Sequence, residues 1–138
     1  MVFADSSGFI AAFDPRDAAH ARAAAAWQAI AKAQERLVTT QLVVAETVTY
    51  LRRRGGWEPS QLAGAAILES PLIEVVGLDA EVFAAAWREF VRIPDPKLSL
   101  CDAASFIVMR DRHLRRAFTL DRHFRDAGFE VVPAARSS

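Results

Sequence analysis

Short apolar runs alternate along the chain with longer segments in which apolar residues recur at helical spacing. Uninterrupted apolar runs are typical of strands buried on both faces, and the longer segments are typical of amphipathic helices. The pattern predicts strands over residues 2–5, 37–40, 72–78, 116–120 and 129–133. It predicts helices over residues 6–13, 17–35, 41–54, 58–70, 79–93, 100–113 and 121–128. This alternation indicates βαβ crossovers, so we expect an α/β fold with a parallel sheet covered on both faces.

Cap and turn residues mark the ends of several predicted helices. Asp17 and Asp79 are placed to cap the helices that follow them, and Gly55–Gly56 ends the helix before it. The 138 residues suffice for one domain with a sizeable core, and they contain no internal repeat, low-complexity segment or linker. We therefore expect a single domain over residues 1–133 and a short C-terminal tail over residues 134–138.

Composition excludes several classes of protein. Apolar residues make up 52% of the chain, which argues against disorder, and no apolar run is long enough to span a bilayer. The N-terminal segment lacks the basic leader and long apolar region of an export signal. Cys101, the one cysteine, cannot form an internal disulfide, which fits a reducing compartment. We expect a cytoplasmic protein with no membrane association, in which Cys101 is a buried, inert thiol.

The basic residues are mostly arginine and are unevenly distributed. Formal net charge is zero, which argues weakly against a nucleic-acid-binding protein. However, Arg52, Arg53 and Arg54 are consecutive, and a second group of six arginines lies between Arg110 and Arg125. The planar guanidinium group can bind two phosphate oxygens at once. Composition alone favours a solvated helix face, and phosphate binding is the alternative.

Four acidic residues are positioned to reach one edge of the predicted sheet. Asp5 and Asp121 each end a strand, Asp102 lies in the first turn of a helix, and Glu46 lies one and a half turns into another helix. In open parallel α/β sheets, ligands bind beyond the carboxyl ends of the strands. We therefore expect these four carboxylates to converge there.

Three of these acids also have a purely structural interpretation. Asp5 and Asp121 can cap the helices that begin after them. Asp102 fits a capping box with Ser99, in which the acid lies three residues after the cap. Taken singly, capping is the favoured interpretation of each.

Glu46 lies too deep in its helix to act as a cap. Helical spacing places it on one face with Leu42, Val43 and Tyr50, and a carboxylate on an apolar face needs an arginine or a metal ion as partner. Several acids around one crevice also need a cation to remain ionised together. Oxygen ligands without clustered His or Cys favour Mg²⁺ or Mn²⁺. The histidines share no ligand spacing, so zinc is not expected.

Four stretches of the sequence resemble the PIN-domain ribonucleases of the VapC toxin type. They are "ADSSGFIAAF", "TTQLVVAETVTYLRRR", "LSLCDAASFIVMRDR" and "AFTLDRHFRDAGF", and the resemblance runs from Val2 to about Val132. Asp5 with Ser6 and Ser7, then Glu46, then Ser99 with Asp102, and finally the strand tip Thr119–Phe124 match the motifs of that family in order. Cys101 departs from the family pattern, in which Thr or another small residue is common.

The resemblance implies a three-layer α/β/α PIN-like fold with a central parallel five-stranded sheet of order 3-2-1-4-5. It implies an endoribonuclease that uses Mg²⁺ or Mn²⁺, forms a homodimer and is inhibited by a cognate VapB-like antitoxin. The implied catalytic and metal-binding residues are Asp5, Glu46, Asp102 and Asp121. Hydroxyls that orient carboxylates or water are expected at Ser7, Ser99 and Thr119. For RNA binding we expect Arg52, Arg53, Arg54 and Arg112, beside the metal site.

The strand tip "FTLDRHF" fits this interpretation. Phe118 and Phe124 would anchor the peptide on either side of Asp121, and we expect His123 to have a structural role. The antitoxin would place an amphipathic segment on the apolar surface of "GFIAAF" and "TVTYL" and direct an arginine toward the carboxylates.

Two rival functions remain at this stage. A haloacid-dehalogenase-like phosphatase needs a second Asp two residues after the first, and that position is Ser7. A non-catalytic PIN-like scaffold that binds RNA or protein would not need all four acids, and a metal-dependent cleavage assay would separate it from a nuclease.

Overall fold

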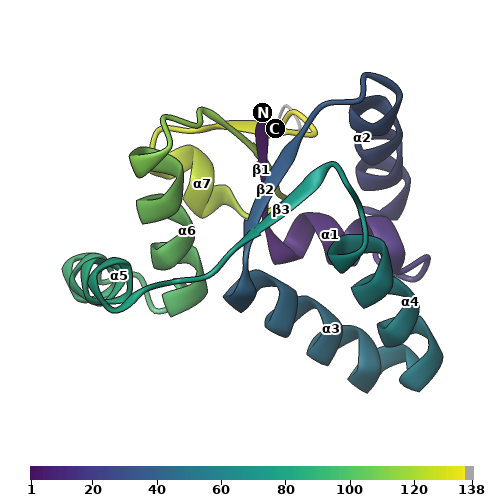
Figure 1. The fold of residues 1–138 in the computed structure, drawn as a ribbon, viewed down its shortest axis with the longest axis horizontal. Coiled ribbons are helices and arrows are strands. Elements are labelled where there is room, and N and C mark those ends of the chain that lie inside the picture. The colour runs from purple at the N-terminus through teal and green to yellow at the C-terminus, as the bar shows by residue number, and fades with distance from the viewer. Residues whose placement is uncertain (136–138) are drawn as a thin grey trace.

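A five-stranded parallel sheet forms the centre of the computed structural model, which describes residues 1–135 (Figure 1). The strands are β1 (Val2–Ala4), β2 (Leu37–Thr40), β3 (Ile73–Val76), β4 (Arg116–Phe118) and β5 (Glu130–Val132). Their order, β3-β2-β1-β4-β5, confirms the predicted sheet. Each strand pairs in parallel with its neighbours, so all five carboxyl ends lie along one edge.

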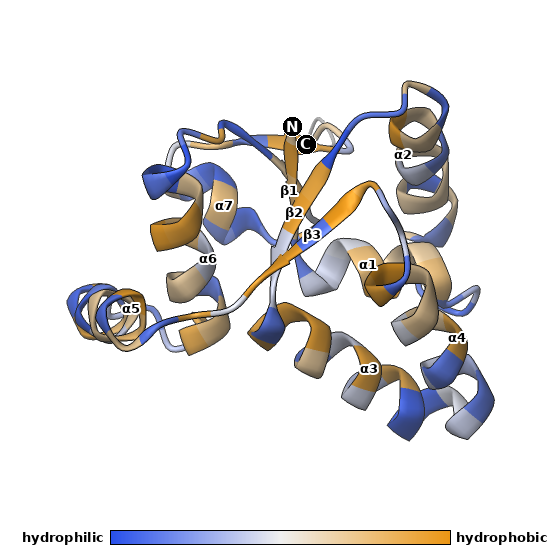
Figure 2. Ribbon diagram, in the orientation of Figure 1, coloured by the Kyte–Doolittle hydropathy of each residue, from blue (hydrophilic) through white to orange (hydrophobic). Residues whose placement is uncertain are grey.

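Seven helices in the described part of the chain lie in two groups, one on each side of the sheet (Figure 1). The first group is α1 (Ser6–Phe13), α2 (His20–Lys32), α3 (Gln41–Gly55) and α4 (Trp57–Leu68). The second group is α5 (Ala80–Arg92), α6 (Leu100–Asp111) and α7 (Arg122–Asp126). This arrangement is the predicted three-layer α/β/α fold. β1 and much of β2 and β3 are hydrophobic, and hydrophilic residues are frequent in the connecting segments and on parts of the helices (Figure 2).

Aromatic side chains fill the core on both sides of the sheet. Phe118, at the end of β4, is fully buried and meets the ring of Phe9 edge to face, with ring centroids 6.4 Å apart. Phe124 is fully buried on α7 and packs against Phe106 of α6 at 5.0 Å. These two phenylalanines flank Asp121, as predicted, and hold the intervening turn against the core.

The predicted N-terminal cap of α5 is confirmed, and that of α2 is not. Asp79 caps α5 as expected, because its side chain accepts a hydrogen bond from the backbone N–H of Val82 at 2.8 Å. The prediction that Asp17 caps the next helix was wrong. Asp17 instead accepts from the backbone N–H of Ala19 within a turn, and α2 begins at His20.

Gly8 allows α1 to approach the end of β4 closely. A Cβ atom at this position would lie 2.5 Å from the carbonyl oxygen of Phe118, well inside van der Waals contact. The same carbonyl accepts a hydrogen bond from the backbone N–H of Asp5 at 3.0 Å. The first turn of α1 is therefore held directly beside the carboxyl ends of β1 and β4.

No helix within residues 1–135 is long and apolar enough to cross a membrane. Ala134 and Ala135 follow β5 without regular structure, and the rest of the predicted tail, residues 136–138, lies outside the described residues.

Candidate functional site

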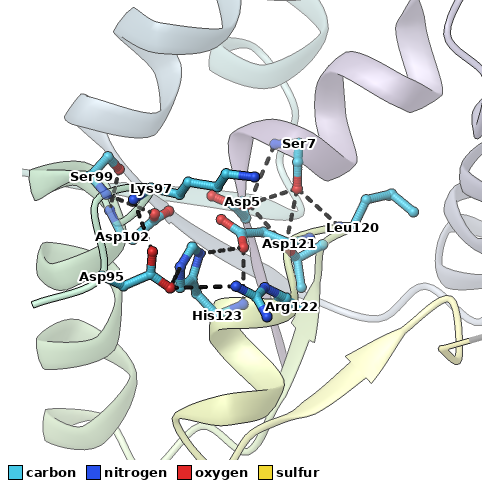
Figure 3. Close-up of polar contacts among 11 residues, drawn as sticks. Asp5, Ser7, Asp95, Lys97, Ser99, Asp102, Leu120, Asp121, Arg122 and His123 are labelled. Atoms are coloured by element: carbon cyan, nitrogen blue, oxygen red, sulfur yellow. Dashed lines mark hydrogen bonds and ion pairs between the residues drawn. The ribbon is translucent and has the colours of Figure 1, made fainter. Parts of the chain in front are cut away.

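Three acidic side chains meet at the carboxyl edge of the sheet, each from the start of a different helix (Figure 3). Asp5 precedes α1, Asp121 precedes α7, and Asp102 lies in the first turn of α6. Ligand atoms of Asp102, Asp121 and His123 all lie within 4.8 Å of one another. We call Asp5, Asp102 and Asp121 the acidic cluster.

Asp5 is the most buried member of the acidic cluster, with 1% of its surface exposed. Its Oδ2 accepts hydrogen bonds from the hydroxyls of Ser7 at 2.8 Å and Thr119 at 2.9 Å. Its Oδ1 is buried and has no hydrogen-bond partner among the described residues. Burial raises the pKa of Asp5 to about 6, against the opposing effect of the hydrogen bonds from Ser7 and Thr119.

The two hydroxyls that hold Asp5 also tie the strand ends together. Ser7 Oγ accepts from the backbone N–H of Leu120 at 2.9 Å, and Thr119 Oγ1 accepts from the backbone N–H of Asp121 at 3.0 Å. Thr119 is almost fully buried, so its side chain has a single fixed environment. Ser7 and Thr119 therefore orient the Asp5 carboxylate, as expected from the sequence.

Asp102 forms the capping box that its spacing from Ser99 predicts. Its Oδ2 accepts from the backbone N–H of Ser99 at 3.0 Å, and the Ser99 hydroxyl accepts from the backbone N–H of Asp102 at 3.0 Å. Its other oxygen makes no hydrogen bond within residues 1–135. Burial raises the pKa of Asp102 to about 7, and the nearby charges of Asp5 and Asp121 add to this increase. Capping and membership of the acidic cluster are therefore compatible.

His123 bridges two carboxylates. Its Nδ1 lies 2.7 Å from Oδ1 of Asp121, and its Nε2 lies 2.9 Å from Oδ2 of Asp95 (Figure 3). Burial alone would lower the pKa of His123, but hydrogen bonds with Asp95 and Asp121 raise it above its ordinary value. Both ring nitrogens are therefore occupied, and His123 fixes the orientation of Asp121.

Asp95 is the functional neighbour that sequence reasoning missed. It lies in the loop after α5, where its Oδ1 accepts from the backbone N–H of Lys97 at 2.9 Å. This bond, followed by the bond with His123, lowers the pKa of Asp95 below its ordinary value. The only signal in the sequence is an acid between two prolines, which predicts a turn and nothing more.

Glu46 lies on α3 and is not among the residues whose ligand atoms lie within 4.8 Å of one another, although it acts, like Asp5 and Asp102, on the neighbouring Cys101. Its side chain is exposed to solvent, so the expectation that Glu46 needs an arginine or a metal ion as partner on an apolar face was wrong. Tyr50, on the same helix, is 39% exposed and packs under the guanidinium of Arg54. Glu46 faces Cys101, whose pKa is raised first by burial and then by the charge of Glu46. Cys101 itself is buried, as expected.

The structure does not bring the predicted RNA-binding arginines to the acidic cluster. Arg52, Arg53 and Arg54 are exposed at the C-terminal end of α3, and Arg53 lies roughly 10 Å beyond Glu46 along the helix axis. Arg112 ends α6, roughly 15 Å from Asp102 along that axis. Its guanidinium forms two hydrogen bonds with Glu74 of β3, at 2.9 and 2.8 Å. The position expected for Arg112, beside the metal site, is therefore wrong.

The donors of the acidic cluster fit a hard divalent cation. They are carboxylate oxygens, which Mg²⁺ and Mn²⁺ prefer, and Oδ1 of Asp5 is a buried acceptor that lacks a partner. The raised pKa values of Asp5 and Asp102 report an environment in which their negative charges are poorly stabilised by the described residues. A cation among these oxygens would supply that stabilisation.

The residue two positions after Asp5 argues against the phosphatase alternative. A haloacid-dehalogenase-like phosphatase would carry a free acid two residues after Asp5, whereas Ser7 is present and its hydroxyl is bonded to Asp5. The arrangement instead offers several fixed carboxylates around one point, which is suited to holding a metal ion rather than to transferring a phosphoryl group onto Asp5.

Comparisons with known proteins cover nearly the whole chain. A family model described as PIN domain matches residues 2–130. Two curated relatives from two strains of Mycobacterium tuberculosis, both named 23S rRNA-specific endonuclease VapC20, are 36% identical over 134 residues, which is 96% of this chain and 99% of each relative. A crystal structure of Mycobacterium tuberculosis VapC20, described as a sarcin–ricin loop cleaving toxin, matches with a TM-score of 0.86 and 31% identity. That match covers 94% of this chain and 96% of that one.

Proposed function

The chain belongs to the PIN-domain family, as a member of the VapC type, and on this premise we propose that it is an endoribonuclease and the toxin of a type II toxin–antitoxin pair. One observation of this chain carries the proposal. Asp5, Asp102 and Asp121 converge at the carboxyl edge of the sheet, and Asp5 turns an unpartnered buried oxygen into the same space. A nuclease of this type needs such a site to act on a phosphodiester.

The metal ion is Mg²⁺ or Mn²⁺, held by Asp5, Asp102 and Asp121, with Glu46 approaching from α3. When bound, such an ion can activate water and stabilise the oxygen that leaves a phosphodiester. The protein itself orients the carboxylates. Ser7 and Thr119 hold Asp5 through its Oδ2, which leaves Oδ1 for the ion. Such supporting hydrogen bonds affect metal affinity strongly.

Asp102 and Asp121 are oriented by contacts within their own helices. The backbone N–H of Ser99 fixes Oδ2 of Asp102, and His123 fixes Oδ1 of Asp121. Each carboxylate keeps a second oxygen that makes no hydrogen bond with residues 1–135. Because Asp5 and Asp102 have raised pKa values, protons compete with the ion for their oxygens.

The substrate is RNA, and the first candidate is the sarcin–ricin loop of 23S rRNA. Two relatives with full-length coverage are named 23S rRNA-specific endonucleases, and the VapC20 crystal structure is described as that of a sarcin–ricin loop cleaving toxin. This substrate places the protein in the cytoplasm. Arg52, Arg53 and Arg54 stay predicted contacts for parts of the RNA beyond the acidic cluster. Arg112 is not included, since Glu74 occupies its guanidinium.

The test is cleavage of a stem-loop RNA that carries the sarcin–ricin sequence, with Mn²⁺ or Mg²⁺ and with chelator. Wild type should cut the RNA only with metal, and Asp5→Asn and Asp102→Asn should abolish cutting. Asp111→Asn is the matched control, because Asp111 is an exposed acid at the other end of α6. Cutting in chelator, or a fully active Asp102→Asn protein, would refute the metal site. A wild-type protein that binds RNA and never cuts it would support the scaffold alternative.

The antitoxin would bind on the side of the sheet covered by α1 and α4. A cavity of about 690 Å³ lies there, lined by Phe13, Pro59 and Leu62. Trp57 and Leu62 on its rim are 62% and 64% exposed, an apolar surface suited to an amphipathic segment. The homodimer is also proposed, with α5 as the contact, because Phe83, Trp87 and Val91 expose one apolar stripe.

A further inference from the structure

A second cavity adjoins the acidic cluster on the side of β5. It has a volume of about 240 Å³, and three arginines from distant parts of the chain line it, Arg22 of α2 with Arg122 and Arg125 of α7. Leu120, Val131 and Pro133 provide an apolar floor. We call this space the arginine cavity.

The arginines of this cavity are weakly engaged compared with others in the protein. Arg22 donates one hydrogen bond, to the backbone carbonyl of Ala134 at 2.9 Å. Arg122 reaches Asp95 only at 3.5 Å, and Arg125 forms no ion pair with residues 1–135. By contrast, Arg92 and Arg110 both bind the buried carboxylate of Glu89, and Arg112 binds Glu74 through two hydrogen bonds. The positive charge of the arginine cavity is therefore available to a ligand.

The arginine cavity shares two residues with the acidic cluster. Thr119, which bonds to Asp5, and Asp121, which bonds to His123, both line its wall. A ligand in the cavity would therefore lie immediately beside the acidic cluster. When a phosphodiester of an RNA strand lies at the acidic cluster, the adjacent nucleotide of that strand must lie within one nucleotide's length of the cluster.

We propose that the arginine cavity binds the RNA nucleotide next to the scissile phosphodiester, and this proposal rests on the nuclease function proposed above. One guanidinium group can bind two phosphate oxygens at once, and unpaired bases stack on guanidinium planes. The apolar floor of Leu120, Val131 and Pro133 accommodates the sugar or base. A nucleotide uses both features of the cavity, whereas an acidic peptide would use only the charge.

The experiment measures RNA binding in chelator, where no cleavage occurs, with the sarcin–ricin stem-loop as the probe. Arg22→Gln with Arg125→Gln removes two charges from the arginine cavity. The control pair, Arg36→Gln with Arg115→Gln, removes two exposed charges near the amino ends of β2 and β4, at the opposite edge of the sheet. Thermal unfolding establishes that each double variant is folded, and calorimetry with Mn²⁺ establishes that the acidic cluster still binds metal.

The cavity variant should bind RNA about tenfold more weakly or worse, and the slope of log affinity against log salt should fall by about 1 for each lost phosphate contact. The control pair should change both quantities far less. Equal losses in the two variants, or no loss in the cavity variant, would overturn the proposal. Loss of antitoxin binding with unchanged RNA binding would assign the cavity to an acidic peptide and would also overturn it.

Binding and cleavage separate this proposal from the nuclease function. If wild type cuts RNA with Mn²⁺ and the cavity variant binds RNA as wild type does, the nuclease function stands and the subsite fails. If wild type binds RNA through the arginine cavity but cuts none with Mn²⁺, the subsite stands and the nuclease function fails. If wild type binds no RNA, the subsite is refuted directly.

Discussion

Replacing Asp102 by Asn in metal-free protein should stabilise it more at neutral and alkaline pH than at acidic pH. The pKa of Asp102 is raised from 3.8 to about 7, chiefly by burial. Between these values the folded protein keeps a proton that the unfolded chain has lost, so the Asp102 contribution to the free energy of unfolding falls as pH rises. Asn cannot titrate, and its amide oxygen can still accept the capping hydrogen bond from the backbone N–H of Ser99.

The magnitude follows from the proton linkage. One bound proton changes the free energy of unfolding by about 1.4 kcal/mol per pH unit. From about pH 5 to about pH 6 the difference is close to one proton, and it falls to about half a proton at pH 7, so this range accounts for about 2 kcal/mol, and only a few tenths are added above pH 7. The stability of Asp102→Asn relative to wild type should therefore increase by about 2–3 kcal/mol between about pH 5 and about pH 8. Asp5 also has a raised pKa, and because its charge acts on Asp102, the difference between the two proteins includes the loss of this coupling.

The assay is urea unfolding of wild type and Asp102→Asn at the two pH values, in chelator. The comparison between pH values cancels any pH-independent cost of the substitution. Asp111→Asn is the control, since its exposed carboxylate is not buried on folding. A stability difference between Asp102→Asn and wild type that is the same at both pH values would refute the argument. Such a result would mean that the Asp102 carboxylate is well stabilised by its capping contacts alone.

Two further changes test the scaffold around the site. Gly8→Ala should lower the free energy of unfolding by about 1–3 kcal/mol, because its Cβ would lie 2.5 Å from the Phe118 carbonyl oxygen. A variant as resistant to urea as wild type would show that α1 can move away from β4 without cost. Ser7→Ala should weaken Mn²⁺ binding about tenfold or more, because Asp5 Oδ2 loses a donor at 2.8 Å; unchanged calorimetric affinity would leave Ser7 with a purely structural role.

The fold was predictable because its signals are local. Each buried strand is a short apolar run between polar turns, and caps such as Asp79 mark where helices begin. The convergence of Asp5, Asp102 and Asp121 was also predictable, because parallel strands place their carboxyl ends on one edge. Asp17 misled because an acid before a helical segment can form a turn as readily as a cap.

The residues that were missed depend on packing between distant segments. Asp95 reaches His123 only because the loop after α5 is folded against α7, and nothing in either local sequence reports this contact. Glu46 looked buried because helical spacing gives the face of a residue but not whether that face is covered. Arg112 was misplaced because a cluster of charges on a helix does not say which end of the sheet it reaches. Arg22 and Arg125 are far apart in sequence and line one cavity together with Val131 of β5.

One oxygen of each acid in the cluster accepts a hydrogen bond from a backbone N–H at the start of its helix, from Ser7 to Asp5, from Ser99 to Asp102 and from His123 to Asp121, and this second role has a genetic consequence. Asp and Asn codons differ by a single purine at their first base. An Asp→Asn change keeps an acceptor for the helix N–H groups and removes the charge, so one point mutation can silence the site while the chain still folds. We expect cells selected to survive this protein to carry such alleles.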